Sequence, residues 1–223
     1  PSLNSKRYNA LDAFVDEYTD AGDKKDNLKI QINYMLRCHV FPVSRRQVYL
    51  PWQAGELTVL SVDPLEIFSS KIVALINRTA PRDLFDIFNM QRFGLFDESQ
   101  EPMLRKCVIL YSAIAAENAP ERFSFDGIQR LSAHQIKTEL LPVLRRAEHF
   151  DLALAQESTM EYLSGLLVPE QRELDFWRAF REKEYKPELL FDSEDVLSRI
   201  ARHPMALWKC GGRESQTHDT PER

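Results

Sequence analysis

The chain has 223 residues, of which 43% are hydrophobic and 28% are charged, and its formal net charge at pH 7 is -5. This composition is that of a folded globular protein and excludes a fibrous or wholly disordered chain. The mildly acidic charge also argues against a surface that is basic throughout, although it leaves room for a local basic groove.

Three cysteines, Cys38, Cys107 and Cys210, lie far apart in the chain and show no Cys-x-x-Cys spacing. This pattern favours a reducing compartment, so we expect a cytoplasmic protein. No stretch approaches the roughly 18 consecutive apolar residues that span a bilayer, and residues 1–7 lack the apolar core of a signal peptide. We therefore expect no membrane partner.

The first part of the chain is predicted to contain one helix and three strands. Apolar residues at spacings of three and four predict a helix over residues 7–19, and the polar residues 21–27 predict a turn. Residues 28–35 alternate in polarity, which predicts a strand with one buried face. Residues 47–50 and 57–62 are rich in β-forming side chains, so we expect them to complete a small antiparallel sheet.

From Asp63 onward the apolar periodicity becomes helical. Asp63 is a candidate N-cap, and Pro64 occupies the first helical position, where its missing N–H costs nothing. Most of the remaining chain is predicted to be helical, and most of the helices open at a proline or a Ser/Asp cap. The predicted helices cover residues 64–78, 81–92, 101–118, 125–131, 133–147, 158–166, 169–183 and 193–202.

These elements predict an α+β fold in which a small sheet-containing domain precedes a helical bundle. We place the first domain at residues 1–97 and the helical domain at residues 98–210. Residues 211–223 are polar and contain almost nothing to bury, so they are expected to form a disordered tail.

The most informative charged residues lie in the two predicted helices after residue 63. Lys71 and Arg78 are seven positions apart and therefore share one helix face. Arg82, Asp83 and Asp86 fall in the first turns of the next helix, where an acid can hold a cation of the preceding helix through charge-assisted hydrogen bonds. The pattern fits either a solvated ion-pair network or a polar site that binds an anion.

The spacing also forms a recognisable motif, Lys-x-x-Ala-Leu-x-x-Arg followed by Arg-Asp-Leu-x-Asp. Its residues here are Lys71, Ala74, Leu75, Arg78, Arg82, Asp83, Leu84 and Asp86. Together with residues 28–37 and 60–66, the motif resembles the AbiEii/AbiGii nucleotidyltransferase toxins of bacterial abortive-infection and toxin–antitoxin pairs. The resemblance covers about residues 28–93.

The resemblance implies roles for individual residues. Lys71 would be a ligand of the nucleotide phosphates, and Asp83 and Asp86 would belong to the same active centre. Arg78 and Arg82 would grip phosphate oxygens, for which a guanidinium fork is well suited. Three further residues within the resembling segments are expected to support the site: Glu66, Gln31 and Arg37.

The chain also departs from the pattern of that family. Such nucleotidyltransferases hold two Mg²⁺ ions with a Gly-Ser or Gly-Gly element followed by Asp-x-Asp, and this chain contains no such combination. The resemblance implies that this part precedes Pro1, so we expect the chain to be incomplete as an enzyme. We also note Gln31 where the family frequently has Glu, because an amide lacks the charge of a carboxylate.

The resemblance implies nucleotidyl transfer from an NTP to an acceptor, with tRNA as the expected acceptor, Mg²⁺ as the cofactor of the complete enzyme and a cognate antitoxin as partner. Two alternatives remain open. The chain could be a non-catalytic helical module that docks an antitoxin or RNA, or a purely structural interaction domain whose charged helices stabilise the fold.

Other conspicuous residues are interpreted as structural. Cys38 and His39 have no second Cys/His pair at ligand spacing, so zinc is not expected. The aromatic side chains are interpreted as core residues and not as base-stacking groups; they are Phe14, Phe85, Phe88 and Phe93, with Trp177, Phe180 and Tyr185 in the helical part.

Overall fold

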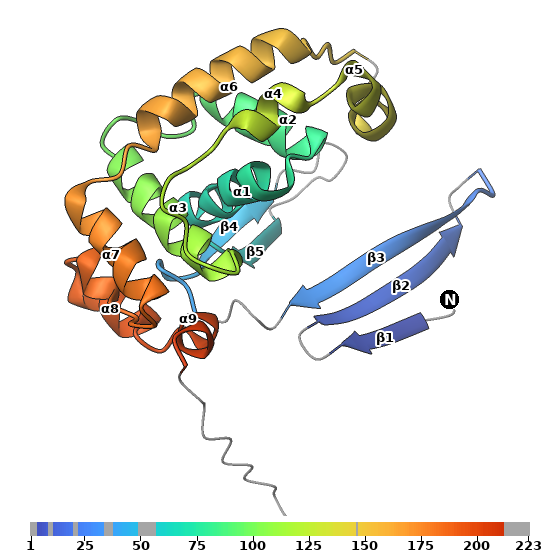
Figure 1. Ribbon diagram of the computed structural model, residues 1–223. Helices are drawn as coiled ribbons and strands as arrows, with labels where there is room; N and C mark the ends of the chain where they lie inside the picture. Colours follow the sequence, from blue (N-terminus) through green and yellow to red (C-terminus); the bar gives the residue numbers. More distant parts are fainter. Residues whose placement is uncertain are drawn as a thin grey trace, which may run out of the picture.

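The computed structural model describes residues 4–8, 11–19, 22–33, 38–48, 57–145 and 147–211. Two small antiparallel sheets accompany a larger helical body, which confirms the predicted α+β class (Figure 1). No helix within these ranges has both the length and the apolar character needed to cross a membrane. Arg37 and the predicted tail beyond Gly211 lie outside the described residues.

The first sheet is a three-stranded meander, and the second is a hairpin. Strand β2 (Leu11–Thr19) lies between β1 (Asn4–Tyr8) and β3 (Lys25–Asn33). Strands β4 (Ser44–Val48) and β5 (Leu57–Ser61) form the hairpin that leads into the first helix. Figure 1 shows the meander standing beside the helical body, whereas the hairpin lies against α1.

The helix predicted over residues 7–19 is wrong, because this segment forms the end of β1 and all of β2. The spacing of its apolar residues fits a helix, but aromatic and β-branched side chains also favour strands. Every residue of β2 pairs with β3, including the cross-strand pair of Phe14 and Ile30. A turn at residues 22–24, with Asp23 at a φ of 59°, lies between β2 and β3 and allows these strands to pair as a hairpin.

The expectation of one sheet with a buried β3 face is also wrong. β3 pairs with β2, and β4 pairs with β5, so the strands belong to separate sheets. Leu28, Ile30 and Ile32 share one face of β3, as predicted, but their side chains are exposed. Strand periodicity indicates that residues share a face and does not indicate what covers that face.

The helical predictions are largely confirmed. Helices α1 (Pro64–Arg78) and α2 (Pro81–Arg92) have the predicted bounds, and α3 (Glu101–Ala115) ends three residues early. The remaining α-helices are α4 (Asp126–Arg130), α5 (Ala133–Gln135), α6 (Leu152–Leu166), α7 (Gln171–Arg181), α8 (Glu194–Ile200) and α9 (Pro204–Lys209), and a 3-10 helix, Pro187–Leu189, lies between α7 and α8. After α5 the chain continues as a π-helix, Ile136–Leu140, and a 3-10 turn, Leu141–Val143.

Two features of the helical body were not predicted. α6 begins six residues before the predicted start, where the side chain of Asp151 accepts a hydrogen bond from the backbone N–H of Leu154 at 3.1 Å. Such an N-cap satisfies an N–H group of the first turn and fixes where the helix begins. α9 has only six residues, too short for an apolar periodicity to identify it.

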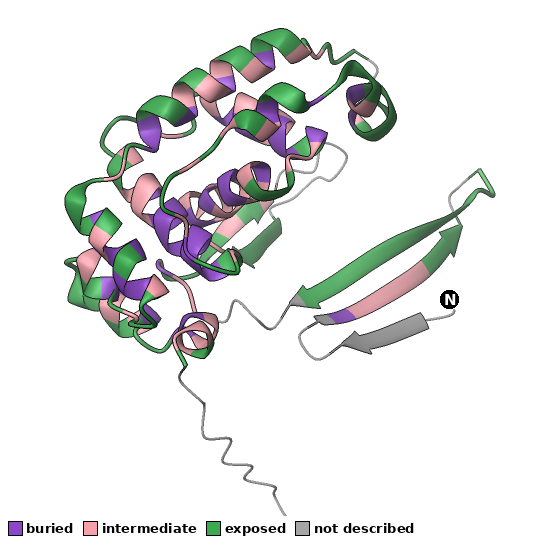
Figure 2. Cartoon of the chain, in the orientation of Figure 1, coloured by how far each residue is buried: buried purple, intermediate pink, exposed green. Residues whose placement is uncertain are grey.

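The hydrophobic core is centred on α3, which packs against α1, α6, α7 and α9. Figure 2 shows the buried residues concentrated on α1 and α3. Trp177 of α7 is fully buried, and its indole N–H donates to the carbonyl of Ile109 at 3.1 Å. This core contains residues on both sides of position 97, and the predicted domain boundary there stays a prediction.

His203 joins α9 to this core as the N-cap of the helix. Its imidazole is fully buried, and its Nδ1 accepts a hydrogen bond from the N–H of Ala206 at 3.4 Å. Among the described residues, Nε2 has no hydrogen-bond partner. Burial lowers the pKa of His203 from 6.5 to about 4, and the nearby His39 contributes to the same direction.

This pKa predicts an acid-sensitive stability. The unfolded chain binds a proton on His203 below pH 6.5, whereas the folded chain does not until pH 4, so the free energy of unfolding falls as the pH drops through that window. We expect the loss due to His203 to reach roughly 3 kcal/mol at pH 4. His203→Asn keeps a capping oxygen and cannot titrate. Urea unfolding at several pH values should give a shallower acid slope for the variant, and equal slopes would contradict this account.

Candidate functional site

The candidate site lies along the seam between α1 and α2. The side chain of Asp63 caps α1 by accepting the N–H of Leu65 at 2.9 Å, as predicted, and it also receives Nη2 of Arg46 from β4 at 2.9 Å. α1 ends at Arg78, its C-cap Thr79 has a left-handed φ of 50°, and α2 starts at Pro81. The two helices therefore form a tight hairpin.

A glycine of α4 supports the turn of this hairpin. A Cβ built on Gly127 would lie 2.3 Å from Oγ1 of Thr79, so only a residue without a side chain allows α4 to approach so closely. α4 thus packs directly against Thr79, the C-cap of α1, at the point where α2 leaves α1.

Arg78 and Asp83 face each other across the seam near the turn. Nε and Nη2 of Arg78 each donate to one oxygen of the Asp83 carboxylate at 2.7 Å, which is the two-point geometry that a guanidinium favours. Asp83 is only 3% exposed, whereas the Arg78 side chain is 67% exposed. These hydrogen bonds and the attraction to Asp83 raise the pKa of Arg78. The Nη1 group takes no part in these two bonds.

Lys71 and Asp86 form a second pair farther along the same seam. Nζ of Lys71 lies 2.5 Å from Oδ2 of Asp86, and the two side chains are 38% and 35% exposed. Lys71 and Arg78 therefore lie two turns apart on one face of α1, as predicted, and each of them faces an acid of α2. The seam carries balanced charge in a position that solvent reaches.

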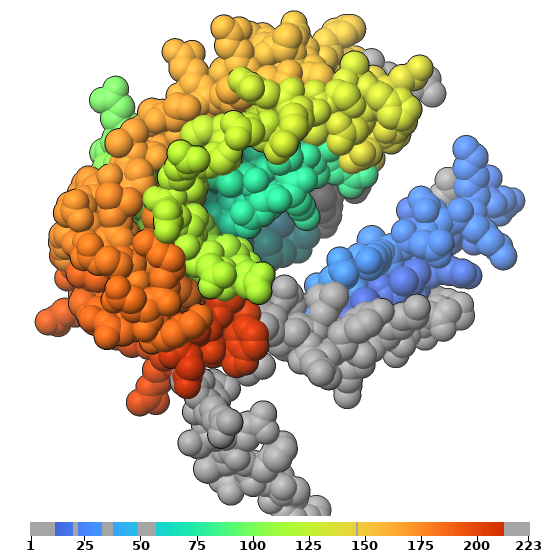
Figure 3. Space-filling model, in the orientation of Figure 1, coloured from blue at the N-terminus to red at the C-terminus, as the bar shows by residue number. Residues whose placement is uncertain are grey.

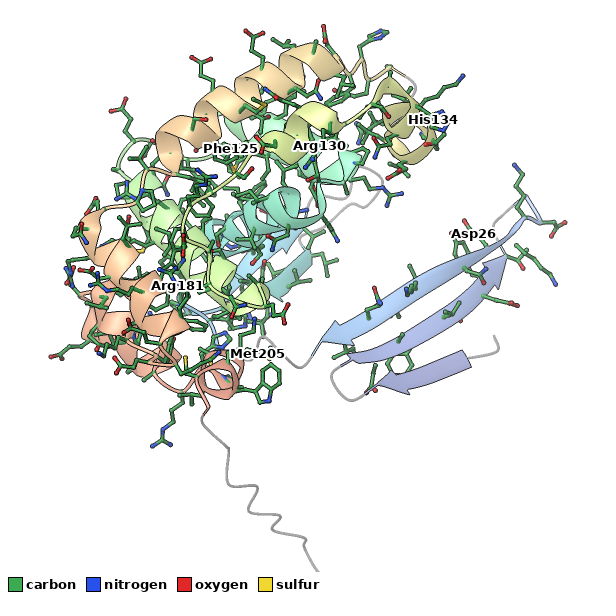
Figure 4. All side chains as sticks on the ribbon, in the orientation of Figure 1. Asp26, Phe125, Arg130, His134, Arg181 and Met205 are labelled. Atoms are coloured by element: carbon green, nitrogen blue, oxygen red, sulfur yellow. The ribbon has the colours of Figure 1, made fainter. Side chains whose placement is uncertain are left out.

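The other residues expected at the site lie elsewhere. Arg82 is exposed and donates from Nε to the carbonyl of Glu139 at 3.3 Å, so it leans toward the π-helix and not toward Asp86. Gln31 is exposed on β3, opposite Ala13 of β2, in the meander that stands beside the helices. Figure 4 shows Asp26 of the same strand at the end farthest from the helical body.

Glu66 lies on a different face of α1 and is buried, with 3% exposure. Its carboxylate interacts with Nδ1 of His39 at 3.0 Å, the N–H of Phe41 at 3.3 Å and the hydroxyl of Tyr111 in α3. Burial, together with the charge of Glu66, raises the pKa of Tyr111 and that of the neighbouring Cys107. Glu66 therefore fastens α1 to α3 and to residues 39–41 and does not reach the seam.

Two cavities flank α1. One, of about 350 Å³, is lined mainly by apolar groups of α1 and α3, with Ser70, Asn77 and Met205 at its border. Figure 3 shows a hollow whose floor is formed by the teal residues of α1 and α2. Met205, which lines the first cavity, is labelled in Figure 4. The other cavity, of about 380 Å³, is lined by Phe68 of α1, by Asp86 and other residues of α2, and by residues that follow α2 in the chain.

The seam has the chemistry of an anion-binding site more than that of a metal site. In the described part of the chain, no three His, Cys, Asp or Glu residues come close enough together to hold a metal ion. Asp83 and Asp86 each already hold a cation. These residues alone do not fit Mg²⁺, so we derive no step that passes through the metal.

Sequence comparison identifies the family to which the chain belongs. The family model described as "Nucleotidyl transferase AbiEii toxin, Type IV TA system" matches residues 2–193, which is most of the chain. Searches of curated proteins and of solved structures found no match. The motif residues of the seam and most of the helical body lie within the matched range.

The two ion pairs should contribute differently to stability. Arg78→Ala leaves the buried Asp83 carboxylate without its two donors, so we expect a loss of about 1–2 kcal/mol even though water partly replaces the exposed guanidinium. Lys71→Ala breaks a pair that is more than a third exposed and should cost less than about 1 kcal/mol. Chemical unfolding of both variants measures the difference. A larger loss for Lys71→Ala would contradict the assignment of Asp83 as the structural acid.

Proposed function

The chain belongs to the nucleotidyl transferase AbiEii toxin family of type IV toxin–antitoxin systems, and we propose on that premise that its α1–α2 seam binds the triphosphate of an NTP during nucleotidyl transfer. The observation that supports the proposal best is the placement of two solvent-accessible cations, Lys71 and Arg78, on one seam. Each is held by a carboxylate of the next helix, so neither has to be ordered when the phosphate arrives.

The two pairs have separate tasks in this proposal. Asp83 is buried and keeps the guanidinium of Arg78 oriented, with Nη1 still available to a phosphate oxygen. Asp86 holds Lys71 at an accessible position, where a phosphate oxygen can replace the carboxylate as the partner of the ammonium. The chain thus supplies positive charge and orientation to the nucleotide.

The complete reaction requires groups that these residues do not provide. Mg²⁺, when bound by an Asp-x-Asp element, would neutralise the triphosphate and activate the acceptor hydroxyl. The acceptor that the family resemblance favours is tRNA, and a toxin–antitoxin family implies a cognate antitoxin. We propose a cytoplasmic site for this activity.

The second candidate function belongs to another class: a module that docks an antitoxin or RNA without catalysis. Exposed basic residues lie on α2 and α4, among them Arg82 and Arg130, and Figure 4 labels Arg130 on α4. Exposed acids such as Asp126 and Glu139 lie among them, so the surface is mixed in charge and gives this alternative less support than the seam gives to nucleotide binding.

Calorimetric titration with inorganic triphosphate and with NTPs tests the proposal. We expect Lys71→Ala to weaken binding of both ligands by about tenfold or more, because a charge-assisted contact to phosphate is lost. Lys186→Ala is the matched control, since Lys186 is also an exposed lysine in an ion pair, with Glu184, but lies far from the seam. Equal affinities of wild type and Lys71→Ala would refute the proposal.

A transfer assay separates the enzyme from the docking module. The protein, incubated with labelled NTPs, Mg²⁺ and total tRNA, should place label in the RNA. Asp86→Asn should lower that transfer while the fold persists. Retained RNA binding without any label in wild type would favour the docking module.

A further inference from the structure

The cavity of about 380 Å³ beside Asp86 combines aromatic walls with a small number of polar groups. It lies where α2 and the following residues meet α1, and most of its wall is apolar. Its aromatic and polar lining residues are Phe68, Phe85, Asp86, Asn89, Phe93 and Glu148. Aromatic walls with a few convergent polar groups are typical of a site for a planar, partly polar ligand.

Phe93 is the unexpected member of this lining. The sequence predicts a core aromatic residue at this position, but the Phe93 side chain is 73% exposed at the C-cap of α2. The guanidinium of Arg92 lies 5.3 Å from its ring centroid, so the ring stands next to a cation. An aromatic ring held at the mouth of a cavity, and not buried within it, can stack against a base at little cost in conformational entropy.

The polar groups of the cavity specify which edge of a ligand they can meet. Glu148 offers carboxylate oxygens, and Nη1 of Arg92 lies 3.9 Å from one of them, too far for a hydrogen bond. Asn89 offers both an acceptor and two donors. A carboxylate accepts N–H groups, so this edge complements a base that carries an exocyclic amino group and disfavours one that presents only carbonyl oxygens there.

Asp86 connects the cavity to the seam, because the same carboxylate lines the cavity and holds Lys71 at 2.5 Å. A ligand with an aromatic ring at one end and phosphates at the other could therefore occupy both places. Along this path the exposed cations Lys71 and Arg78 lie at the seam and the Glu148 carboxylate lines the cavity, an arrangement that can accept phosphates at the seam and an amino group in the cavity.

We infer that this cavity is the base subsite of the nucleotide, with Phe93 stacking on the base and Glu148 accepting its exocyclic amino group. The inference rests on the proposed function, since it places the triphosphate at Lys71 and Arg78. It goes beyond that function by assigning base selectivity to residues outside the motif.

Binding of ATP, CTP, GTP, UTP and inorganic triphosphate to variants of the chain tests the subsite. Phe93→Ala should weaken binding of the preferred NTPs by at least about fivefold, because base stacking is lost, and should leave inorganic triphosphate unchanged. Trp208→Ala is the matched control, since Trp208 is an aromatic residue of similar exposure, 69%, on α9. Because both rings are exposed, neither change should impair folding.

The Glu148→Gln variant tests selectivity. UTP carries the one base of the four that lacks an exocyclic amino group, so it should bind wild type more weakly than the other three NTPs do. Glu148→Gln should reduce this difference in affinity. If wild type binds all four equally, or if Phe93→Ala binds NTPs as wild type does, the base subsite is refuted while triphosphate binding at Lys71 still stands. Failure of wild type to bind inorganic triphosphate or any NTP would overturn the proposed function together with the subsite.

Discussion

The arrangement of the seam depends on one constraint, the burial of Asp83 at the first turn of α2. A carboxylate with 3% exposure needs donors, and it obtains two from the guanidinium of Arg78 at the end of α1. That bond sets how α2 folds back on α1 and therefore which residues meet farther along the seam. Lys71 and Asp86 come together as a result, in a position that solvent reaches. The pair that contains the buried Asp83 fixes the geometry of the hairpin, and the pair of Lys71 and Asp86 supplies a cation that a ligand can bind.

The rest of the helical body holds this hairpin in place. Glu66 connects α1 to Tyr111 of α3 and to His39, while Gly127 lets α4 approach the turn at Thr79. α2 packs on α6, so both helices of the hairpin rest on the common core. A preorganised site loses little conformational entropy when the ligand binds. The buried contacts on the other faces of α1 and α2 hold the site in this preorganised state.

The sequence predicted those features that depend on local chemistry. Asp63 as N-cap and Pro64 and Pro81 at first helical positions were sufficient to place α1 and α2, and the spacing of Lys71 and Arg78 predicted a shared face. The strand at residues 11–19 was missed because its pairing with β3 outweighs a helical spacing. The contacts of Glu66 join residues 27 and 45 positions away, and no local pattern reports them. The exposure of Phe93 was missed for the same reason, since the end of a helix leaves open which neighbours reach it.

The most direct test of the account is to identify the lysine that a bound nucleotide touches. A nucleotide acyl phosphate delivers its acyl group to an amine held beside the phosphates, and mass spectrometry locates the modified residue. The account predicts acylation of Lys71, suppressed by excess inorganic triphosphate, with Lys186 unmodified. Acylation at lysines remote from the seam, with Lys71 unmodified, would contradict it.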